Sequence, residues 1–349
     1  MGLKRRSEKP VGVIGAGSFG TAIANLLAEN SNVLLFARNK AVVKQMVDQG
    51  LSQGQQLHER VQAVNDLQLI AEKCDVIFPV VPSSQFRKMM QGFGSFLHPY
   101  HILIHATKGL DCKSYDLEES PGKLSRNEVR TMSEVIREES SVVRIGCLAG
   151  PNLARELADC QPAAAVVASP FDEVIQAGQR LLRSERFQVY SSNDLIGIEW
   201  CGVLKNIIAI GAGALSGLGY GENARALLIS RGMSEMIRVG KAFGGNTEAF
   251  LGLAGVGDLV ATCSSTLSRN FTVGNRLAKG EKLEYILNDM KEVAEGVNTI
   301  KIVHHMANSY KVRAPITHSL YQVLFEGLRV EEALQYLMKY PFYVDIDFM

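Results

Sequence analysis

The sequence lacks the marks of several specialised protein classes. Its 37 basic and 36 acidic residues nearly cancel, so no overall field favours nucleic acid or a membrane surface as a partner. Its 6 cysteines include no C-x-x-C pair, which is typical of reduced thiols in the cytoplasm and not of disulfides or zinc sites. The 7 histidines have no ligand spacing beyond the adjacent His304 and His305, so we expect no metal site.

Long uninterrupted apolar runs are also lacking. No stretch reaches the roughly 20 residues that span a bilayer, because the longest contains Lys205 and several glycines. The basic start MGLKRRSEKP and the run that follows it resemble a signal peptide, but glycines break the run and no A-x-A-like cleavage site follows. We therefore predict a soluble, cytoplasmic protein without membrane insertion.

One lysine stands alone in apolar surroundings. Residues 200–221 are apolar and glycine-rich, and Lys205 is the only side chain among them expected to carry charge. Burial disfavours the ammonium form and lowers a lysine pKa toward neutral pH. Lys205 is therefore a candidate general acid. The alternative, on this segment alone, is a lysine whose charged end reaches the surface.

The two halves of the chain have different periodicities. Strand-like segments at 11–14, 33–36, 76–81, 102–106, 145–148, 163–168 and 187–190 alternate with helix-like segments. This alternation predicts a parallel sheet with crossover helices. From Asp194 to about Lys339 the periodicity is helical. We expect an α/β fold, with an N-terminal Rossmann-type dinucleotide-binding domain (1–191) followed by an all-α substrate-binding and catalytic domain (192–349).

A glycine motif follows the first predicted strand. Gly15, Gly17 and Gly20 match G-x-G-x-x-G between the strand VGVI and the helix TAIANLLA. Glycines there allow a tight turn and bring backbone amides close to a pyrophosphate at the helix N-terminus. Ser18 and Phe19 are then expected to line the cofactor site.

Arg38 follows the second predicted strand, where an acidic residue would favour NAD and an arginine favours a 2′-phosphate. No Asp or Glu occurs before Asp48. The sequence therefore favours NADP(H), with NAD(H) as the alternative and a surface arginine of no consequence as a second one.

Polar residues also follow later strands and open helices. Lys108 comes just after a predicted strand, where a cation can meet a phosphate or a substrate oxygen, and the segment 150–152 offers backbone amides. Ser268, Arg269 and Asn270 combine a hydroxyl, a guanidinium and helix amides into a phosphate clamp. Asp258 is placed to orient or tune Lys205. Helix capping is the alternative for Ser268 and Asp258.

Together these motifs resemble the bacterial biosynthetic NAD(P)-dependent glycerol-3-phosphate dehydrogenases over nearly the whole chain. The matching segments are GAGSFG (15–20), VPSS (81–84), ATKGL (106–110), GPNLARE (150–156), LKNIIAIGAGALSGLGYGENARALLISRG (204–232), GVGDLVATCSSTLSRN (255–270) and VAEGVNT (293–299). The resemblance implies reversible reduction of dihydroxyacetone phosphate to sn-glycerol 3-phosphate with NAD(P)H, which supplies glycerophospholipid synthesis.

The resemblance also implies residue roles. The catalytic residues would be Lys205 as proton donor and acceptor, Asp258, and Asn206 lining the site. The substrate-binding residues would be Lys108, Gly150, Asn152, Lys205, Asp258, Ser268, Arg269 and Asn270. The cofactor-binding residues would be Gly15, Gly17, Ser18, Phe19, Gly20, Arg38, Lys108, Ala154, Arg269, Val293 and Glu295.

The chain departs from the family pattern in two places. Asn152 and Leu153 stand where a small hydroxyl residue and an aromatic are more usual, so we expect a backbone contact at Asn152 and not a side-chain one. The loop at 112–126 looks long for the bacterial type and carries no motif.

Two other functions stay open. The first is another two-domain reductase, of the β-hydroxyacid or ketopantoate type, but residues 268–270 suit a phosphate better than a bare carboxylate. A non-catalytic NADPH sensor or scaffold has no reason to keep Lys205 in apolar surroundings. We also expect a homodimer that forms through the helical half.

Overall fold

The computed structural model describes residues 9–112, 124–290, 292–341 and 344. The chain forms two compact units. The first unit comprises Met1–Thr107, Met132–Leu148 and Asn152–Leu195, and the second comprises Lys108–Thr131, Ala149–Pro151 and Ile196–Met349. Residues 113–123 of the loop that the sequence suggests lie outside the described ranges.

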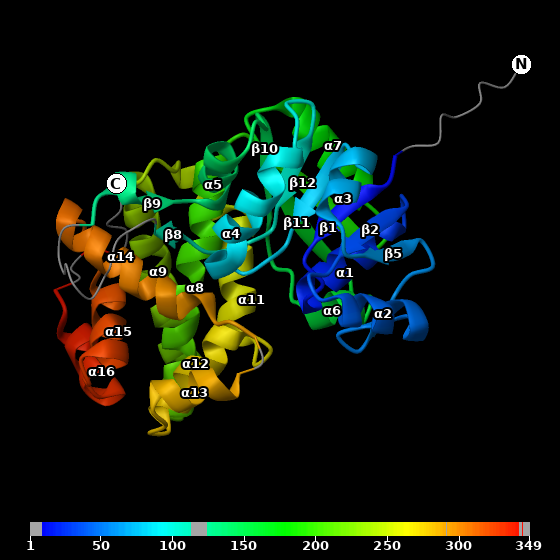
Figure 1. Cartoon of the computed structure of the whole chain (residues 1–349). Coiled ribbons are helices and arrows are strands. Elements are labelled where there is room, and N and C mark those ends of the chain that lie inside the picture. The colour runs from blue at the N-terminus through cyan, green and yellow to red at the C-terminus, as the bar shows by residue number, and fades with distance from the viewer. Residues whose placement is uncertain (1–8, 113–123, 291, 342–343, 345–349) are drawn as a thin grey trace, which may run out of the picture. The chain divides into compact units, whose positions relative to one another are not determined.

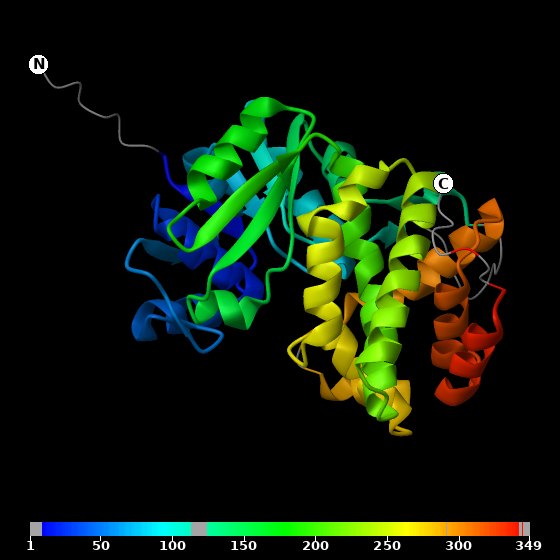
Figure 2. The ribbon, with the colours of Figure 1, turned by 180° about the vertical axis from the view of Figure 1, so that it is seen from behind.

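An eight-stranded sheet forms the centre of the first unit (Figures 1 and 2). Its order is β12-β11-β10-β7-β6-β1-β2-β5. The strands are β1 (Val11–Ile14), β2 (Val33–Phe36), β5 (Val61–Val64), β6 (Val76–Pro79), β7 (Ile102–His105), β10 (Arg144–Ala149), β11 (Ala163–Ala168) and β12 (Phe187–Ser192). Strand β1 pairs in parallel with β2 on one side and β6 on the other, so Ile14 lies opposite both Phe36 and Pro79. The mostly parallel Rossmann-type sheet is thereby confirmed, with its order reversing beside β1.

Helices cover both faces of this sheet. They are α1 (Ser18–Ala28), α2 (Lys40–Gln49), α3 (Leu67–Lys73), α4 (Ser83–Phe93), α5 (Met132–Glu139), α6 (Ala154–Ala158) and α7 (Asp172–Leu182). Val13 and Phe78 pack with α1 and α7 in one apolar cluster, whereas their neighbours Ile14 and Ile77 pack with α3, α4 and α5 in another. Because side chains alternate along a strand, central strands such as β1 and β6 contribute to both cores, which explains their continuous apolar character.

Some elements of the first unit escape the sequence patterns. Strand β5 and helix α3 are not predicted. Strand β5 is an edge strand in which only Val64 is buried, and the sequence signal of a strand depends on burial. A short antiparallel pair joins β3 (Leu51–Ser52) and β4 (Gln55–Gln56). In the second unit, β8 (Asp111–Cys112) pairs with β9 (Val129–Arg130) in the same way, so that unit is not purely helical.

The second unit is otherwise built from helices. They are α8 (Leu195–Gly217), α9 (Glu222–Ala242), α10 (Thr247–Leu251), the π-helical turn η3 (Leu253–Gly257), α11 (Asp258–Ser264), α12 (Arg269–Ala278), α13 (Leu283–Asp289), α14 (Glu295–Tyr310), α15 (Pro315–Phe325) and α16 (Val330–Lys339). This confirms the predicted change to helical structure after the last strand of the sheet. His304 and His305 lie buried in α14, where they pack instead of facing solvent.

Helix α8 is the buried centre of the second unit. By length and composition it is apolar enough to span a membrane, which corrects the expectation that no stretch is long enough. However, 94% of its most apolar window is buried inside the protein. A helix that is apolar all round is also what the core of a large protein requires. A membrane-spanning helix and a core helix can therefore have the same kind of sequence, and they differ only in what surrounds the helix.

Glycines let α8 and α12 approach at backbone distance. A Cβ atom on Gly213 of α8 would lie 1.9 Å from the carbonyl oxygen of Phe271, and one on Gly274 of α12 would lie 1.8 Å from that of Ile210. Both contacts are far below van der Waals separation, so no side chain fits at either position. The glycine spacing of α8 therefore fixes where the start of α12 lies.

Replacing Gly274 with alanine is expected to destabilise the second unit. The added methyl group meets backbone, which cannot rotate away, and overpacking of this kind costs roughly 1–3 kcal/mol. Chemical denaturation of Gly274→Ala against the parent protein measures the loss. As a control, Gly92→Ala lies in helix α4 with nothing within 4 Å of the new Cβ, so it is expected to stabilise by roughly 0.5–1 kcal/mol. Equal effects of the two variants would contradict the close contact.

Candidate active site

The glycine turn of the first unit has the geometry of an anion-binding loop. Gly15 follows β1 with φ +117°, and a Cβ there would lie 2.2 Å from the carbonyl oxygen of Val80. A Cβ on Gly20 would lie 1.8 Å from the carbonyl oxygen of Gly15, whereas Gly17 is exposed with nothing within 4 Å of its Cβ position. Gly15 and Gly20 thus shape the turn, and Gly17 leaves open space before the N-terminus of α1, where a phosphate group fits.

The first unit contains four further residues that the sequence assigns to the cofactor: Ser18, Phe19, Arg38 and Ala154. Ser18 and Phe19 are half-buried in the first turn of α1. The backbone N–H of Gly15 donates to the carbonyl oxygen of Phe36 over 3.1 Å, and the exposed Arg38 comes two residues after Phe36, so its chain position is beside the turn. Ala154 opens the short helix α6, which packs against α1.

A buried carboxylate joins two lysines in the second unit. Lys205 Nζ donates to Asp258 Oδ1 over 2.8 Å, and Lys108 Nζ donates to Asp258 Oδ2 over 2.6 Å. Lys108 also donates to the carbonyl oxygen of Gly150 over 2.9 Å. The Lys205 and Asp258 side chains are only 7% and 3% exposed, whereas that of Lys108 is 18% exposed. The structure therefore brings together three predicted site residues, and the charged end of Lys205 does not reach the surface.

The sequence patterns miss one member of this cluster, Thr262. Its hydroxyl accepts a hydrogen bond from Lys205 Nζ over 2.6 Å and donates to the carbonyl oxygen of Asp258 over 2.6 Å. Asp258 and Thr262 are four residues apart in α11, so they share one face of that helix. This spacing is visible in GDLVAT, and it is the signal that identifies Thr262.

The cluster perturbs the pKa values of its members. Burial lowers the pKa of Lys205 from 10.5 to about 8; the Asp258 carboxylate opposes this shift, and repulsion from Lys108 adds to it. Burial favours the neutral form of Asp258, but the two neighbouring ammonium groups outweigh burial and hold the pKa of this carboxyl below its usual value. Lys205 can therefore exchange a proton near neutral pH while Asp258 stays ionised.

A chain of amide hydrogen bonds lies beside the lysines. Asn206 Nδ2 donates to the carbonyl oxygens of Lys108 and Gly202, each over 3.2 Å. Asn270 Nδ2 donates to Asn206 Oδ1 over 2.9 Å, and Asn270 Oδ1 accepts from the backbone N–H of Gly296 over 2.9 Å. Both polar atoms of the Asn270 side chain are thus engaged within the protein, and its contact with a substrate phosphate stays a prediction.

Ser268 is buried like Asn270, whereas Arg269 is exposed. Ser268 Oγ accepts from the backbone N–H of Phe271 over 3.3 Å, so this serine caps α12. Arg269 is 46% exposed; its guanidinium lies 3.5 Å from Glu292 and donates to the carbonyl oxygen of Val293 over 3.1 Å. Glu295 opens α14 one residue before Gly296. The predicted residues at 268–270, 293 and 295 therefore lie in one neighbourhood of the second unit.

Comparisons with known proteins agree with this arrangement. The family model described as NAD-dependent glycerol-3-phosphate dehydrogenase N-terminus matches residues 10–175, and the corresponding C-terminus matches residues 194–335. A glycerol-3-phosphate dehydrogenase [NAD(P)+] of Pseudomonas putida is 40% identical over 347 residues, which cover 98% of this chain and 97% of that protein. One from Azotobacter vinelandii is 38% identical and covers 98% of each chain.

Solved structures of glycerol-3-phosphate dehydrogenases are also similar to this chain. A glycerol-3-phosphate dehydrogenase from Coxiella burnetii has a TM-score of 0.86 and 32% identity, covering 96% of this chain and 100% of that one. A ketopantoate reductase from Ralstonia eutropha, with a TM-score of 0.58 and 14% identity over 93% of this chain and 99% of that one, is similar in fold alone.

The Rossmann-type unit with its glycine turn and the helical unit with its buried lysine define an NAD(P)-dependent oxidoreductase. More closely, the chain belongs to the NAD-dependent glycerol-3-phosphate dehydrogenase family.

Replacing Asp258 with asparagine is expected to destabilise the second unit strongly at pH 6. Removing one partner of a buried ion pair costs about 3–5 kcal/mol, and here two ammonium groups lose the same partner. The loss is expected to be smaller at pH 9, because Lys205, with its pKa of about 8, is then mostly neutral already. Urea unfolding at both pH values measures the difference.

Asp289→Asn is the matched control. It removes a carboxylate whose side chain is 72% exposed and which pairs with Arg276, so its effect is expected to be within experimental error at both pH values. A loss for Asp258→Asn that is equally small, or that grows toward pH 9, would contradict the role assigned to this carboxylate.

Proposed function

We propose that the protein catalyses the reversible reduction of dihydroxyacetone phosphate to sn-glycerol 3-phosphate with NAD(P)H, and that Lys205 is the general acid and base. The observation that carries this proposal is the buried Lys205 ammonium on Asp258, beside a second cation, in a chain of this family. A proton donor with a pKa near the working pH is what reduction of a carbonyl requires.

Lys205 gives its proton to the oxygen of the substrate carbonyl as negative charge develops there. Asp258 and Thr262 hold its ammonium group from two sides, which fixes the direction in which the proton leaves. Lys108 pairs with the other carboxylate oxygen and stabilises the developing charge as a fixed cation. In the oxidative direction the neutral Lys205 amine takes the hydroxyl proton back.

The phosphate of the substrate is assigned to the residues around the start of α12. Arg269 is the strongest candidate because its guanidinium is half exposed, and its 3.5 Å pairing with Glu292 is a weak surface interaction that a phosphate can replace. Ser268, Asn270, Gly150 and Asn152 complete the proposed set, with Asn270 contributing its backbone N–H or acting through Asn206. Phosphate binding away from the reacting carbon orients the carbonyl.

The glycine turn is proposed to hold the cofactor pyrophosphate on the backbone N–H groups at the start of α1. Gly15, Gly17 and Gly20 leave room for it, and the further proposed contacts are Ser18, Phe19, Arg38, Lys108, Ala154, Arg269, Val293 and Glu295. When bound, the reduced nicotinamide supplies the hydride. Arg38 supports NADP(H) over NAD(H), because a guanidinium pairs with a 2′-phosphate and no carboxylate follows β2 to hold a ribose hydroxyl.

The remaining parts of the proposal concern the setting of the enzyme. Residues 1–191 are assigned to the cofactor and residues 192–349 to the substrate and the catalytic groups. The protein is proposed to act in the cytoplasm, to supply glycerophospholipid synthesis and to be a homodimer through the helical half. A keto acid reductase and a non-catalytic sensor are the competing functions. Neither is expected to turn over dihydroxyacetone phosphate.

Replacing Lys205 with methionine is expected to lower kcat for dihydroxyacetone phosphate with NADPH by about 10²–10⁴-fold, because the carbonyl oxygen loses its proton donor. The fall in absorbance of the reduced cofactor measures this rate, and NADPH binding is expected to be nearly unchanged. Lys279→Met, an exposed lysine after α12, is the matched control and should keep full activity. Loss of NADPH affinity or of folding in Lys205→Met would return this lysine to a structural role.

The same assay tests the competing functions and the pKa. Turnover of a keto acid but not of dihydroxyacetone phosphate would favour the keto acid reductase, and no turnover of either would favour the sensor. The rate of reduction should fall as pH rises through about 8, and the rate of oxidation should rise over the same range, because the two directions need opposite protonation states of Lys205.

Replacing Arg38 with alanine is expected to raise the KM for NADPH about tenfold, the loss of roughly 1.4 kcal/mol of binding, with little change for NADH. Initial rates with each cofactor measure both constants. Arg60→Ala, at another exposed arginine of the first unit, should change neither. Equal changes for the two cofactors in Arg38→Ala would refute the assignment of the 2′-phosphate.

A further inference from the structure

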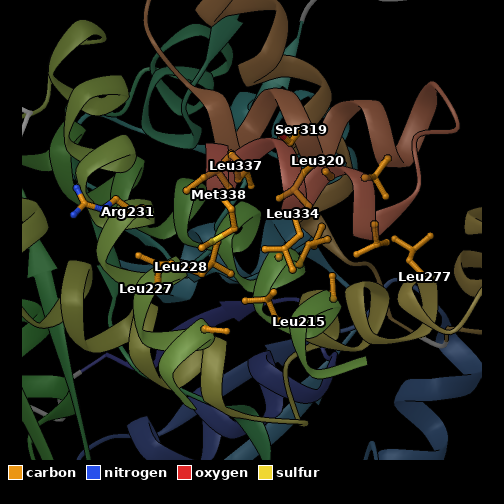
Figure 3. A pocket seen from close by; sticks show the side chains of 18 of the residues that line it. Leu215, Leu227, Leu228, Arg231, Leu277, Ser319, Leu320, Leu334, Leu337 and Met338 are labelled. Carbon is orange, nitrogen blue, oxygen red and sulfur yellow. The ribbon is translucent and has the colours of Figure 1, made fainter. Parts of the chain in front are cut away.

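The second unit contains an apolar cavity of about 310 Å³ among α8, α9, α12, α15 and α16. Figure 3 shows leucine side chains such as Leu215, Leu320 and Leu334 along its wall. Because the hydrophobic effect is non-directional, such a lining alone does not distinguish one apolar molecule from another. In the first unit, by contrast, a short hairpin makes specific polar contacts with the glycine turn.

The β3–β4 hairpin is fixed along one face of helix α1. Thr21 Oγ1 and Ser52 Oγ share a hydrogen bond of 2.7 Å, and both residues are buried. Asn25 Nδ2 donates to the carbonyl oxygen of Gln56 over 2.8 Å, and Asn25 Oδ1 accepts from the backbone N–H of His58 over 3.0 Å. Because Thr21 and Asn25 are four residues apart, they share one face of α1. The hairpin therefore has a set position along this helix.

Two glutamines of this hairpin reach the glycine turn. Gln53 Nε2 donates to the carbonyl oxygen of Ala16 over 3.2 Å, and Gln55 Nε2 donates to that of Ser18 over 3.0 Å. Ala16 and Ser18 lie on either side of Gly17. The hairpin therefore holds the middle of the turn at two carbonyl groups.

These contacts set the direction of two N–H groups. A trans peptide unit is planar, so its C=O and N–H groups point in opposite directions. A fixed carbonyl at Ala16 directs the N–H of Gly17 away from the hairpin, and a fixed carbonyl at Ser18 does the same for the N–H of Phe19. Both N–H groups belong to the N-terminus of α1, where helix N–H groups lack an intrahelical partner and bind phosphate.

Gln53 is unfavourable for the backbone that it occupies. The two-residue loop of the hairpin is Gln53-Gly54, with φ of +51° and +76°, and positive φ at both positions is what a type I′ turn requires. Asparagine, aspartate or glycine is preferred at the first position of that turn, and positive φ is uncommon for other residues. Turn geometry therefore does not explain a glutamine here, whereas its reach to Ala16 does.

Gln55 carries a cost of a different kind. Its Oε1 is buried without a hydrogen-bond partner among the residues that the structure describes. A buried acceptor of this kind is destabilising, and an apolar side chain of similar size would avoid the cost. Nε2 of the same amide donates to Ser18. Each glutamine is thus a poor choice for the hairpin itself, and each donates to the turn.

We propose that Gln53 and Gln55 are positioning residues for the dinucleotide, because they hold the glycine turn with its N–H groups directed at the cofactor pyrophosphate. This inference rests on the proposed cofactor site at that turn. A turn that is already ordered loses less of the binding free energy when the pyrophosphate arrives. NAD(H) and NADP(H) share the pyrophosphate, so the effect is expected to be equal for both, unlike that of Arg38.

Titration of the full chain with NADPH and with NADH, followed by the fluorescence of the reduced cofactor, tests the proposal. Gln53→Asn suits the turn but is one methylene shorter, so the contact with Ala16 is lost. Both dissociation constants should rise about threefold, while the unfolding temperature of the cofactor-free protein does not fall. Gln55→Met removes the donor together with the unpaired acceptor and should have the same two effects. Gln56→Met is the matched control, because its side chain donates to the carbonyl oxygen of Gly50 and not to the turn; both constants should stay unchanged.

The double variant Gln53→Asn/Gln55→Met should weaken binding about tenfold, because each glutamine holds a different peptide unit and the two effects multiply. Unchanged dissociation constants in the folded variants would overturn the positioning role and leave the cofactor site itself intact. Weaker binding together with a lower unfolding temperature would assign the glutamines to the stability of the hairpin instead. A loss limited to NADPH would also overturn the proposal, because the pyrophosphate is common to both cofactors. A parent protein that binds neither cofactor would refute the cofactor site, and with it both this inference and the proposed function.

Discussion

The carboxylate of Asp258 is the interaction on which the rest of the site depends. It holds one ammonium group on each oxygen, from Lys205 of α8 and from Lys108, which lies almost a hundred residues earlier in the chain. Two cations at such short range repel each other and are costly to bury. The carboxylate offsets both effects, and it leaves one net positive charge in largely buried surroundings, where an anion is attracted.

Backbone packing also positions the residues around this charge. The glycine contacts between α8 and α12 bring Asn270 to Asn206, and Asn206 in turn holds the carbonyl oxygen of Lys108. The lysines therefore gain fixed positions from uncharged residues as well as from Asp258. Preorganisation of this kind reduces the rearrangement needed when charge develops on a substrate.

Much of the fold follows from the sequence because its determinants are local. The strands of the sheet are short apolar runs bounded by breakers, and the glycine turn after β1 carries its own conformational signature at Gly15. Strand β5 is not recognised in this way because it is held by its edge pairing with β2 and buries only Val64. Helix α8 has a clear apolar signal, but this signal does not reveal its surroundings. Only the tertiary structure distinguishes a core helix from one that spans a membrane.

The site is predictable where single residues are chemically unusual and less so where pairing decides the role. A lone lysine in an apolar segment makes Lys205 a candidate from the sequence, and its burial on Asp258 in the structure excludes the alternative that its charged end reaches the surface. Thr262 looks like any helical threonine until Asp258 and Lys205 are seen beside it. The bonds of the Asn270 side chain to Asn206 and Gly296 are likewise seen only in the structure. Spacing along the chain places Thr262 on the same helix face as Asp258, but only the contact with Lys205, from a distant segment, shows its role.

Gly296 shows that a glycine beside the site can limit which substitutions the site tolerates. A Cβ there would lie 2.7 Å from both the carbonyl oxygen of Asn206 and Oδ1 of Asn270. In a library built to alter cofactor choice, the exposed Arg38 can be varied without disturbing any core. Any residue larger than glycine at 296 instead pushes on the amide chain beside the lysines. Substitution of Arg38 therefore leaves the packing of the first unit intact, while position 296 of the second unit tolerates only glycine.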